Sequence, residues 1–328
     1  MSSFPAFVQS KKPLFILSFP AAGCLDLTVE DLVTDADNQA AAIQEIYRQF
    51  PEQAALTGLM DLSLEAEAFG CPIRFSPDDL PVVTSPIVTD KESARILPVP
   101  SLTAGRLPVT LAALKQVRAA HPSVPLLAGS IGPFSLAGRL ADPSTALMMP
   151  VTDPDTLTVL MDKTTQFLIT WLESFKAMGC DGVIMAEPLA GLMSPAMNRK
   201  FVLPWLKKII EAVQDDSFSV VLHNCGPSAG KCWKVWKTSG AAAYHFGNAI
   251  DLEPVLQSDP DVPVYGNLDP VAFVTQSPET IRQMTGTLIR KYRPYPMWRF
   301  SSGCDIPAAA RIETIQAAFD AFKKESEL

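Results

Sequence analysis

Short apolar runs that alternate with helical patterns are the feature that most constrains the fold of this chain. Eight runs have the length and composition of β-strands. They span residues 14–18, 55–61, 124–130, 182–188, 219–225, 241–247, 262–268 and 297–304. Strands separated by helices pair in parallel, and eight such units close into a barrel. We therefore predict an α/β protein, a (β/α)₈ TIM barrel forming a single domain over residues 1–328, with an N-terminal extension.

A Pro-rich stretch interrupts the alternation between the second and third predicted strands. Residues 75–123 include SPDDLPVVTSPIV and show no regular apolar period. We predict a long irregular excursion there that covers the mouth of the barrel. A doubly wound open sheet is the rival architecture, and it needs a Gly-rich phosphate turn after its first strand. The corresponding segment, FPAAGCLDLT, lacks the G-x-G-x-x-G pattern.

The net charge and the cysteine content of the chain indicate which classes of partner and which cellular compartment to expect. The 328 residues carry a net charge of −8 and have a pI near 5.0, so we expect neither nucleic acid nor an anionic membrane as a partner. No run reaches the roughly 18 apolar residues that a membrane-spanning helix needs. The six cysteines show no tight pairing, and the N-terminus is a poor signal peptide. We therefore predict a cytoplasmic protein with reduced thiols.

Polar residues follow the ends of most predicted strands. In a parallel barrel the carboxyl ends of the strands meet at one face, where active sites lie. The chemistry-bearing residues at these ends are Asp61, Glu187, His223, Cys225, His245, Asn248, Asn267, Asp269, Cys304 and Asp305. From this set we predict catalytic roles for Asp61, Glu187 and His245. Asn248 and Asn267 are predicted to contact a cofactor.

His223 and Cys225 lie two residues apart at the end of one predicted strand. Because side chains alternate between the faces of a strand, both can point to one place. A thiolate from Cys304, at the end of another strand, would complete a three-ligand site for Zn²⁺. Three protein ligands leave a fourth position open, which is the arrangement of catalytic rather than structural zinc. The sequence therefore predicts a zinc enzyme with His223, Cys225 and Cys304 as metal ligands.

Several of these residues also have simpler explanations. An H-x-C pair on its own more often marks a buried histidine and a small cysteine. Glu187 fits a helix cap or a structural carboxylate equally well, and His245 either orients a neighbouring group or exchanges protons. Asn267 and Asp269 fit a turn before a helix, since Asp-Pro favours helix entry. Cys232 is a further candidate ligand, although we expect it to pack inside a helix.

Several motifs together resemble the uroporphyrinogen decarboxylase superfamily. They are DLSLEAEAFGCPI (61–73), AGSIGPFSLAGRL (128–140), AEPLAGLMSP (186–195), HNCG (223–226), YGNLDP (265–270) and SSGCDIP (301–307). The H-x-C motif followed by a distant G-C resembles the zinc-dependent branch of cobalamin-linked methyltransferases, which includes the methylcobamide:coenzyme M methyltransferases. The resemblance covers nearly the whole chain. It implies a TIM barrel whose zinc is bound by His223, Cys225 and Cys304.

The resemblance also implies a reaction, the transfer of a methyl group between a corrinoid of the methylcobalamin type and a small-molecule methyl acceptor or donor. A corrinoid is too large for the barrel to enclose, so the resemblance implies a separate corrinoid-binding protein that docks over the mouth. Two thiolates and one imidazole make a formally neutral zinc site, in which a bound thiol is deprotonated yet stays nucleophilic. This ligand set favours alkyl transfer to sulfur over hydrolysis.

The chain departs from this branch at one place. Coenzyme M enzymes of the branch commonly show an acidic pair near the end of the sixth strand, where this chain has Gly247 and Asn248. An acidic fourth ligand therefore has no counterpart there, and Glu187 or water would fill the position.

Three alternative functions stay open. The same site could demethylate a methylated substrate and pass the methyl group to the corrinoid. Uroporphyrinogen decarboxylation would need cationic side chains just after the first strand, and LSFPAAGCLDLT has none. A non-catalytic protein of a corrinoid pathway would instead hold a closed structural zinc, with a fourth strong ligand such as Cys232.

Overall fold

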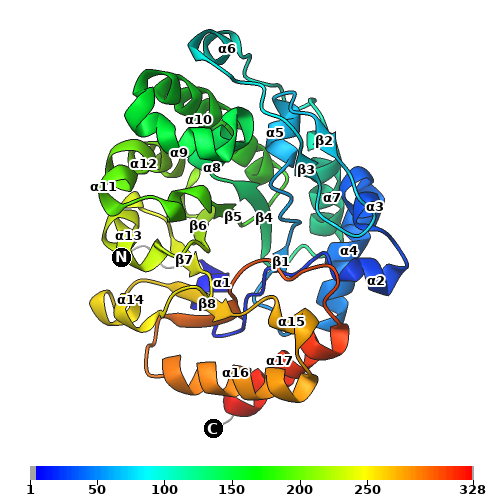
Figure 1. Cartoon of the computed structure of the whole chain (residues 1–328). Helices are drawn as coiled ribbons and strands as arrows, with labels where there is room; N and C mark the ends of the chain where they lie inside the picture. The colour runs from blue at the N-terminus through cyan, green and yellow to red at the C-terminus, as the bar shows by residue number, and fades with distance from the viewer. Residues whose placement is uncertain (1–4, 327–328) are drawn as a thin grey trace.

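The computed structural model describes residues 5–326, and its centre is a parallel sheet that curls into a barrel (Figure 1). The strands follow the order β1-β4-β5-β6-β7-β8-β9, and neighbouring strands run parallel. They are β1 (Leu56–Thr57), β4 (Leu126–Ile131), β5 (Gly182–Ala186), β6 (Ser219–Asn224), β7 (Ala243–Phe246), β8 (Val264–Leu268) and β9 (Trp298–Ser302). Each strand overlaps a run predicted from the sequence, so the prediction of a TIM-barrel-type α/β fold is confirmed.

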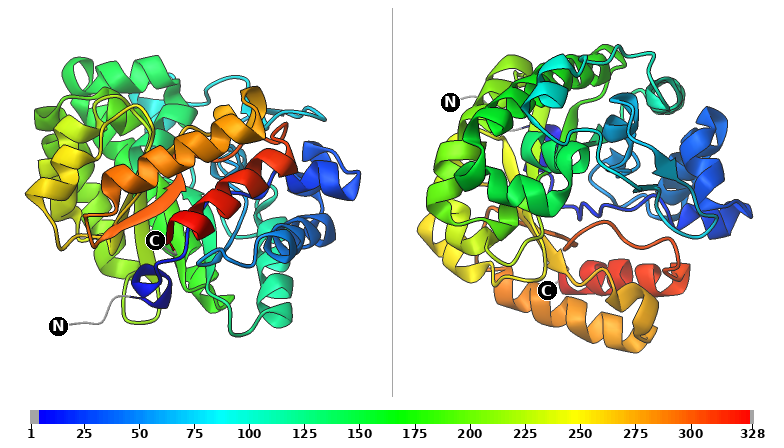
Figure 2. Two further views of the ribbon diagram at one scale, coloured as in Figure 1. Left: turned by 90° about the horizontal axis from the view of Figure 1, so that it is seen from below. Right: turned by 45° about the horizontal axis from the view of Figure 1, so that its top comes forward.

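Helices surround the sheet, with α10 and α12 on one side and α16 and α17 on another (Figure 1; Figure 2, right). They are α1 (Ala6–Gln9), α2 (Ala21–Leu25), α3 (Val29–Thr34), α4 (Ala36–Gln49), α5 (Leu64–Ala68), α6 (Lys91–Ile96), α7 (Leu107–Ala120), α8 (Pro133–Ala141), α9 (Pro143–Thr152), α10 (Pro154–Ala177), α11 (Pro195–Met197), α12 (Leu203–Val213), α13 (Ala229–Trp236), α14 (Glu253–Ser258), α15 (Ala272–Thr275), α16 (Pro278–Tyr292) and α17 (Ile312–Ser326). Within residues 5–326, no helix has the length and apolar character needed to cross a membrane.

The longest helix, α10, shows how the sequence sets the elements. Asp153 caps its first turn by accepting a hydrogen bond from the Thr156 backbone N–H at 3.1 Å. Pro154 follows at the first helical position, where its missing N–H costs nothing. Apolar residues then recur at helical spacing, and Phe167 and Trp171 are fully buried against the sheet layer. Burial of this face, rather than helix propensity alone, holds α10 in place.

The first predicted strand, residues 14–18, does not form a backbone ladder with a neighbouring strand. It still occupies the gap in the barrel between β9 and β1. The Leu14 N–H donates to the Phe300 carbonyl at 3.0 Å, and the Ser18 hydroxyl donates to the Thr57 carbonyl at 2.7 Å. The eighth position of the barrel is therefore filled by a segment whose bonds come largely from side chains.

The barrel interior is apolar and is closed at one end by α1. The residues of this inner cluster are Phe7, Val8, Leu14, Ile16, Ala54, Ala55, Met60, Leu127, Ile184, Ala186, Val221, Ala243 and Tyr265. The Tyr265 hydroxyl donates to the Phe7 carbonyl at 3.3 Å, and Arg299 Nε donates to the Val8 carbonyl at 3.1 Å. Tyr265 and Arg299 lie near the starts of β8 and β9. The N-terminal extension thus plugs the end where strands begin and leaves the other end open for a site.

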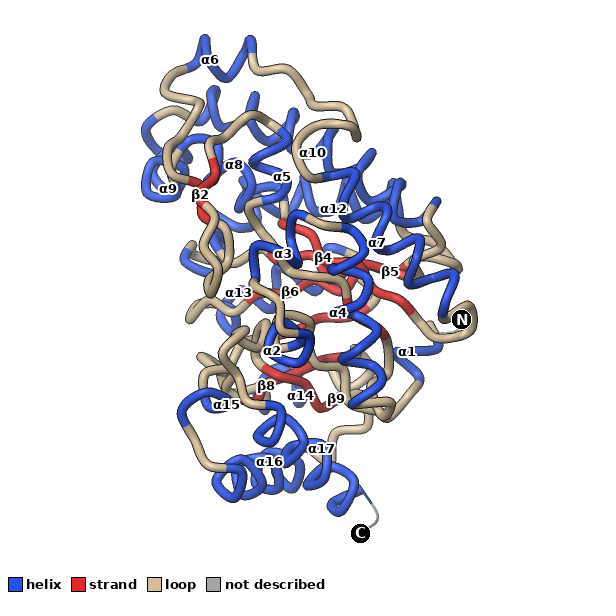
Figure 3. Tube along the Cα trace, turned by 90° about the vertical axis from the view of Figure 1, so that its right-hand side faces the viewer, coloured by secondary structure: helices blue, strands red, loops and turns tan. Residues whose placement is uncertain are grey.

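The excursion between β1 and β4 contains more regular structure than predicted. It holds the antiparallel pair β2 (Ile73–Arg74) and β3 (Val82–Val83), and then α6 and α7. Pro108 lies in the first turn of α7, where proline is tolerated, so it does not break the helix. Figures 1 and 3 show α6 projecting at one end of the molecule.

Candidate metal centre

His223, Cys225 and Cys304 meet at the end of the barrel where the strands finish. His223 lies near the end of β6, Cys225 follows that strand, and Cys304 follows β9. The metal-binding atoms of the three residues all lie within 4.8 Å of one another, and Cys304 Sγ is 3.5 Å from His223 Nε2. Given Zn–S and Zn–N bonds of about 2.3 and 2.0 Å, two sulfur ligands on a tetrahedral zinc ion lie about 3.8 Å apart, and a sulfur and a nitrogen ligand lie about 3.5 Å apart. The donor set and its spacing therefore fit Zn²⁺.

The two cysteines of the cluster shift each other's pKa in opposite directions. The Cys304 thiol, together with the His223 ring, lowers the pKa of Cys225 to about 4. The resulting Cys225 thiolate, with burial, raises the pKa of Cys304 well above its usual value. Without a metal, Cys225 is therefore the cysteine of the pair that ionises more readily. A bound divalent cation would deprotonate both thiols.

A second histidine lies directly behind His223. His223 and His245 are paired across β6 and β7, and their Nδ1 atoms are 2.7 Å apart. His245 Nε2 is 2.8 Å from Ser301 Oγ on β9. His245 is fully buried, and burial, with the neighbouring His223, holds the pKa of His245 well below its usual value. His245 is therefore a neutral ring in contact with a candidate ligand.

Two adjoining cavities open beside the cluster. One has a volume of about 250 Å³ and is bordered by His223, Cys225 and Cys304. The other has a volume of about 300 Å³ and also reaches Cys225. Arg139, from α8, lines both cavities. No hydrogen bond or ion pair joins the Arg139 guanidinium to another residue within the described part of the chain. A substrate in this space would meet a candidate metal and an uncompensated cation.

Comparisons with known proteins place this architecture in a family. The family model described as uroporphyrinogen decarboxylase (URO-D) matches residues 22–325. The chain belongs to the uroporphyrinogen decarboxylase family. The resemblance proposed from its motifs is therefore confirmed, although the family name by itself does not separate decarboxylases from methyltransferases.

The relatives of this chain include proteins named as methyltransferases and proteins named as uroporphyrinogen decarboxylases. The chain is 30% identical, over 69% of its length, to a methylated-thiol–coenzyme M methyltransferase of Methanosarcina mazei, of which the match spans 61%. It is 26% identical, over 80% of its length, to the methylcobamide:CoM methyltransferase MtbA of Methanosarcina acetivorans, of which the match spans 77%. A solved methyltransferase from Methanosarcina mazei superposes with a TM-score of 0.85 at 20% identity, covering 97% of this chain and 96% of that one. The last match supports the fold.

Of the predicted catalytic residues, Asp61 borders the cavity beside the cluster. Arg106 Nη1 donates to Asp61 Oδ2 at 2.6 Å, and the same guanidinium donates through Nε to Glu67 at 2.6 Å. The Ser63 hydroxyl donates to the other Asp61 oxygen at 2.6 Å. Asp61 is therefore held rigidly at the edge of this cavity, with its charge balanced by Arg106.

Glu187 is turned away from the cluster toward α8. It accepts hydrogen bonds from the backbone N–H groups of Phe134, at 3.0 Å, and Ser135, at 2.7 Å, and from the Ser135 hydroxyl. Burial raises the pKa of Glu187 to about 7. The simpler explanation, a carboxylate that caps a helix start, describes this geometry. Glu187 does not border either cavity beside the cluster.

The predicted cofactor-binding asparagines also lie off the cluster. Asn267 Nδ2 donates to the carbonyls of Gly247, at 3.0 Å, and Ile250, at 2.8 Å, so it supports the loop after β7. Asn248 is exposed. Gly247, by contrast, packs on the cluster: a Cβ there would lie 2.7 Å from both Cα and Cβ of Cys225. An acidic side chain therefore has no room at this position without movement of Cys225.

The remaining cysteines are separate from the cluster. Cys232 is fully buried in α13, where its sulfur accepts a hydrogen bond from Asn198 Nδ2 at 3.3 Å and lies 3.5 Å from the Met193 carbonyl. All six cysteines are free. Cys232 is thus a packing residue and does not supply a fourth metal ligand.

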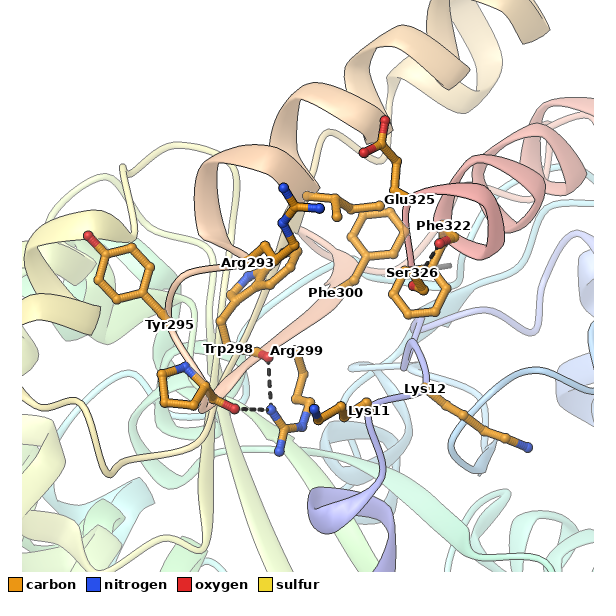
Figure 4. Close-up of a pocket in the computed structure, with 12 residues that line it drawn as sticks. Lys11, Lys12, Arg293, Tyr295, Trp298, Arg299, Phe300, Phe322, Glu325 and Ser326 are labelled. Atoms are coloured by element: carbon orange, nitrogen blue, oxygen red, sulfur yellow. Dashed lines mark hydrogen bonds between the residues drawn. The ribbon is translucent and has the colours of Figure 1, made fainter. Parts of the chain in front are cut away.

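A larger cavity, of about 550 Å³, lies near the plugged end of the barrel (Figure 4). Its walls include Trp298, Phe322, Lys11 and Arg299. Figure 4 shows the Arg299 guanidinium bonded to the Pro296 and Trp298 carbonyls, at 2.7 and 2.9 Å. Through its Nε bond to the Val8 carbonyl, Arg299 also holds α1, and the cavity is remote from the cysteines and histidines of the cluster.

Arg106, Arg139 and Ser301 shape the site but were not predicted. Arg106 follows an irregular loop, and no local pattern links it to Asp61. Arg139 had a sequence signal, since it is the one charged residue in the largely apolar segment PFSLAGRLA that forms α8. Ser301 also had one, because it is a polar residue inside a buried strand.

Proposed function

We propose that this protein is a zinc-dependent methyltransferase that moves a methyl group between a corrinoid of the methylcobalamin type and a thiol. The observation that carries the proposal is the cluster of His223, Cys225 and Cys304, which borders a cavity at the open end of the barrel. Relatives named as coenzyme M methyltransferases support the reaction class. The corrinoid would arrive on a separate corrinoid-binding protein.

The ligand set suits thiol chemistry. His223, Cys225 and Cys304 would hold Zn²⁺, which when bound lowers the pKa of an incoming thiol and keeps its sulfur nucleophilic. The two cysteines bring the negative charge that keeps the site neutral as a whole. Asp61 is the predicted catalytic residue whose carboxylate borders the cavity, where its ion pair with Arg106 and its bond to Ser63 hold the wall in place.

Arg139 is the cation that borders the two cavities in the described part of the chain, and its guanidinium has no bonded partner there, whereas the Asp61 carboxylate is already paired with Arg106. A thiol with an anionic group at its other end would place that group on the Arg139 guanidinium while its sulfur reaches the cluster. Replacing Arg139 by leucine should raise KM for an anionic thiol at least tenfold and leave KM for a neutral thiol unchanged. Arg139→Lys should recover part of the loss, because a point charge replaces the guanidinium fork.

The rim of the open end offers a docking surface for the partner. Leu80 and Val82, from the excursion, and Leu192, after β5, border the two cavities and are 42%, 41% and 56% exposed. Large apolar side chains exposed around a polar centre are typical of protein contact sites. The corrinoid-binding protein would cover them as it delivers the methyl group.

The alternative functions fit these features less well. A highly anionic tetrapyrrole needs several cations, whereas Arg139 is the single cation bordering the two cavities among the described residues. A closed structural zinc needs a fourth protein ligand, and Cys232 is held elsewhere by Asn198. Methyl transfer in the demethylating direction uses the same groups, so only kinetics with both substrates separates it.

The test combines metal analysis with turnover. The purified protein should contain one zinc per chain and consume methylcobalamin in the presence of the right thiol, and X-ray absorption should show one added sulfur ligand. Cys225→Ala and Cys304→Ala should lose the zinc, whereas Cys232→Ala, the matched buried cysteine, should keep it. Stoichiometric zinc without thiol-dependent turnover and without new sulfur would refute the proposal.

A further inference from the structure

A continuous chain of hydrogen bonds runs from the candidate ligand His223 to the barrel wall. His223 Nδ1 contacts His245 Nδ1 at 2.7 Å, and His245 Nε2 contacts Ser301 Oγ at 2.8 Å. The Ser301 hydroxyl is in turn bonded to the carbonyl oxygen of Leu14, in the segment that closes the barrel. His223 is 2% exposed, and His245 and Ser301 are fully buried. Water therefore does not compete for these bonds.

The Leu14 carbonyl, at the end of this series of hydrogen bonds, fixes the direction of all of them. A carbonyl oxygen can only accept, so the single proton of the Ser301 hydroxyl points to Leu14. Ser301 Oγ must then accept from His245, which places the His245 proton on Nε2. His245 Nδ1 is consequently an acceptor, and the His223 proton lies on Nδ1.

The opposite direction is disfavoured by the same groups. It would need the Ser301 proton to point at His245 Nε2. Ser301 Oγ and the Leu14 carbonyl would then face each other as two buried acceptors with no proton between them. An unmade hydrogen bond of this kind is costly, because neither buried acceptor can turn to water instead. One tautomer of each histidine is thus strongly favoured.

We propose that His245 and Ser301 are positioning residues that fix His223 in its Nδ1-protonated tautomer, so that the Nε2 lone pair faces Cys304 and the metal position before any metal binds. The value of this arrangement rests on the proposed function, because it requires His223 to be a ligand. The tautomer itself does not depend on that function.

The hydrogen-bond chain through His245 and Ser301 has a second chemical consequence. A histidine ligand is commonly oriented by a carboxylate, which pushes negative charge toward the metal. Here the orienting groups are a neutral imidazole, a hydroxyl and a carbonyl, which add no charge. The formal charge of the site is therefore set by Cys225 and Cys304 alone.

The composition of the protein makes the tautomers directly measurable. The chain has three histidines, and His121 lies outside the cluster, so a ¹⁵N-histidine-labelled sample gives three resolvable rings. Long-range ¹H–¹⁵N correlation spectra of the metal-free protein should show His223 protonated at Nδ1 and His245 at Nε2. A His223 ring protonated at Nε2, or a mixture of both tautomers in the folded protein, would overturn the proposal.

Two adjacent serines provide a matched pair of variants. Ser301→Ala removes the hydroxyl that fixes the direction, so we expect mixed tautomers and a zinc affinity lower by about 10- to 100-fold in a chelator competition. Ser302→Ala removes a hydroxyl that accepts from the Ile16 N–H at 3.3 Å, in the same closing segment. It should leave both tautomers and the zinc affinity unchanged. Equal loss of zinc in both variants would show a merely structural role and refute the inference.

The outcomes also separate this inference from the proposed function. If the tautomers are as expected and no thiol accepts the methyl group, the positioning role stands and the proposed function fails. If the enzyme turns over with zinc bound but metal-free His223 carries its proton on Nε2, the positioning role alone fails.

Discussion

Gly247→Ala is the sharpest test of the packing around the candidate metal centre. The new Cβ would lie 2.7 Å from Cα and Cβ of Cys225, whereas ordinary contacts begin at 3.4 Å, so Cys225 must retreat by about 0.7 Å. Metal–ligand distances tolerate only about 0.2 Å. We therefore expect the Cys225 sulfur to leave its position and the zinc affinity to fall by about 10- to 100-fold.

The assay is a competition for zinc against a colorimetric chelator, with circular dichroism to verify folding. Gly230→Ala is the matched control, because its new Cβ meets only Ile250, at 3.7 Å, and alanine favours the helix α13. Equal zinc affinities of the two folded variants would refute the argument that Gly247 keeps the space for Cys225.

Other predictions concern the buried charges. Burial raises the pKa of Glu65 to about 7, so ionisation lowers stability as the pH rises from about 4.5 to 7. In urea unfolding above pH 7, the free energy of unfolding of Glu65→Gln should therefore exceed that of the parent protein by up to roughly 3 kcal/mol. The two free energies should converge near pH 4. A difference between them that does not change with pH would contradict this explanation. Arg106→Met strands the buried Asp61 carboxylate and should lower the free energy of unfolding by roughly 3 kcal/mol, whereas Arg95→Met, at an exposed ion pair, should change it little. Similar losses in both arginine variants would argue against a buried charge network.

The strand pattern predicted that the cluster residues meet, and its parity explains why Glu187 and Asn248 lie off the cluster. Ala186 pairs with His223 across β5 and β6 and points into the barrel, so the next residue, Glu187, points outward to α8. The same count places Gly247, two residues after His245, on the inner face, and leaves Asn248 outside. Alternation therefore held within each strand, but a polar residue at a strand end was not by itself evidence of an inward side chain.

Other features depend on contacts that no local pattern reveals. Residues 14–18 are as apolar as a strand, yet the Phe15 N–H bonds to the Gln53 side chain at 2.7 Å instead of a strand backbone. Arg106 reaches Asp61 from 45 residues away. Such pairings follow from the closed barrel, so they become visible only once the fold is known.

Residues 14–18, which close the barrel between β9 and β1, form a seam in its wall where the regular backbone ladder is missing. Elsewhere the wall is a ladder of backbone bonds, but along residues 14–18 it depends on a few side chains, among them Gln53 and Ser302. Bonds of this kind break one at a time, whereas a ladder opens cooperatively, so local opening should begin at this seam. Amide hydrogens there should exchange before those of β5 and β6. Because Leu14 also terminates the bonds that hold His245, each opening of the seam would loosen the inner wall of the site while the rest of the barrel stays folded.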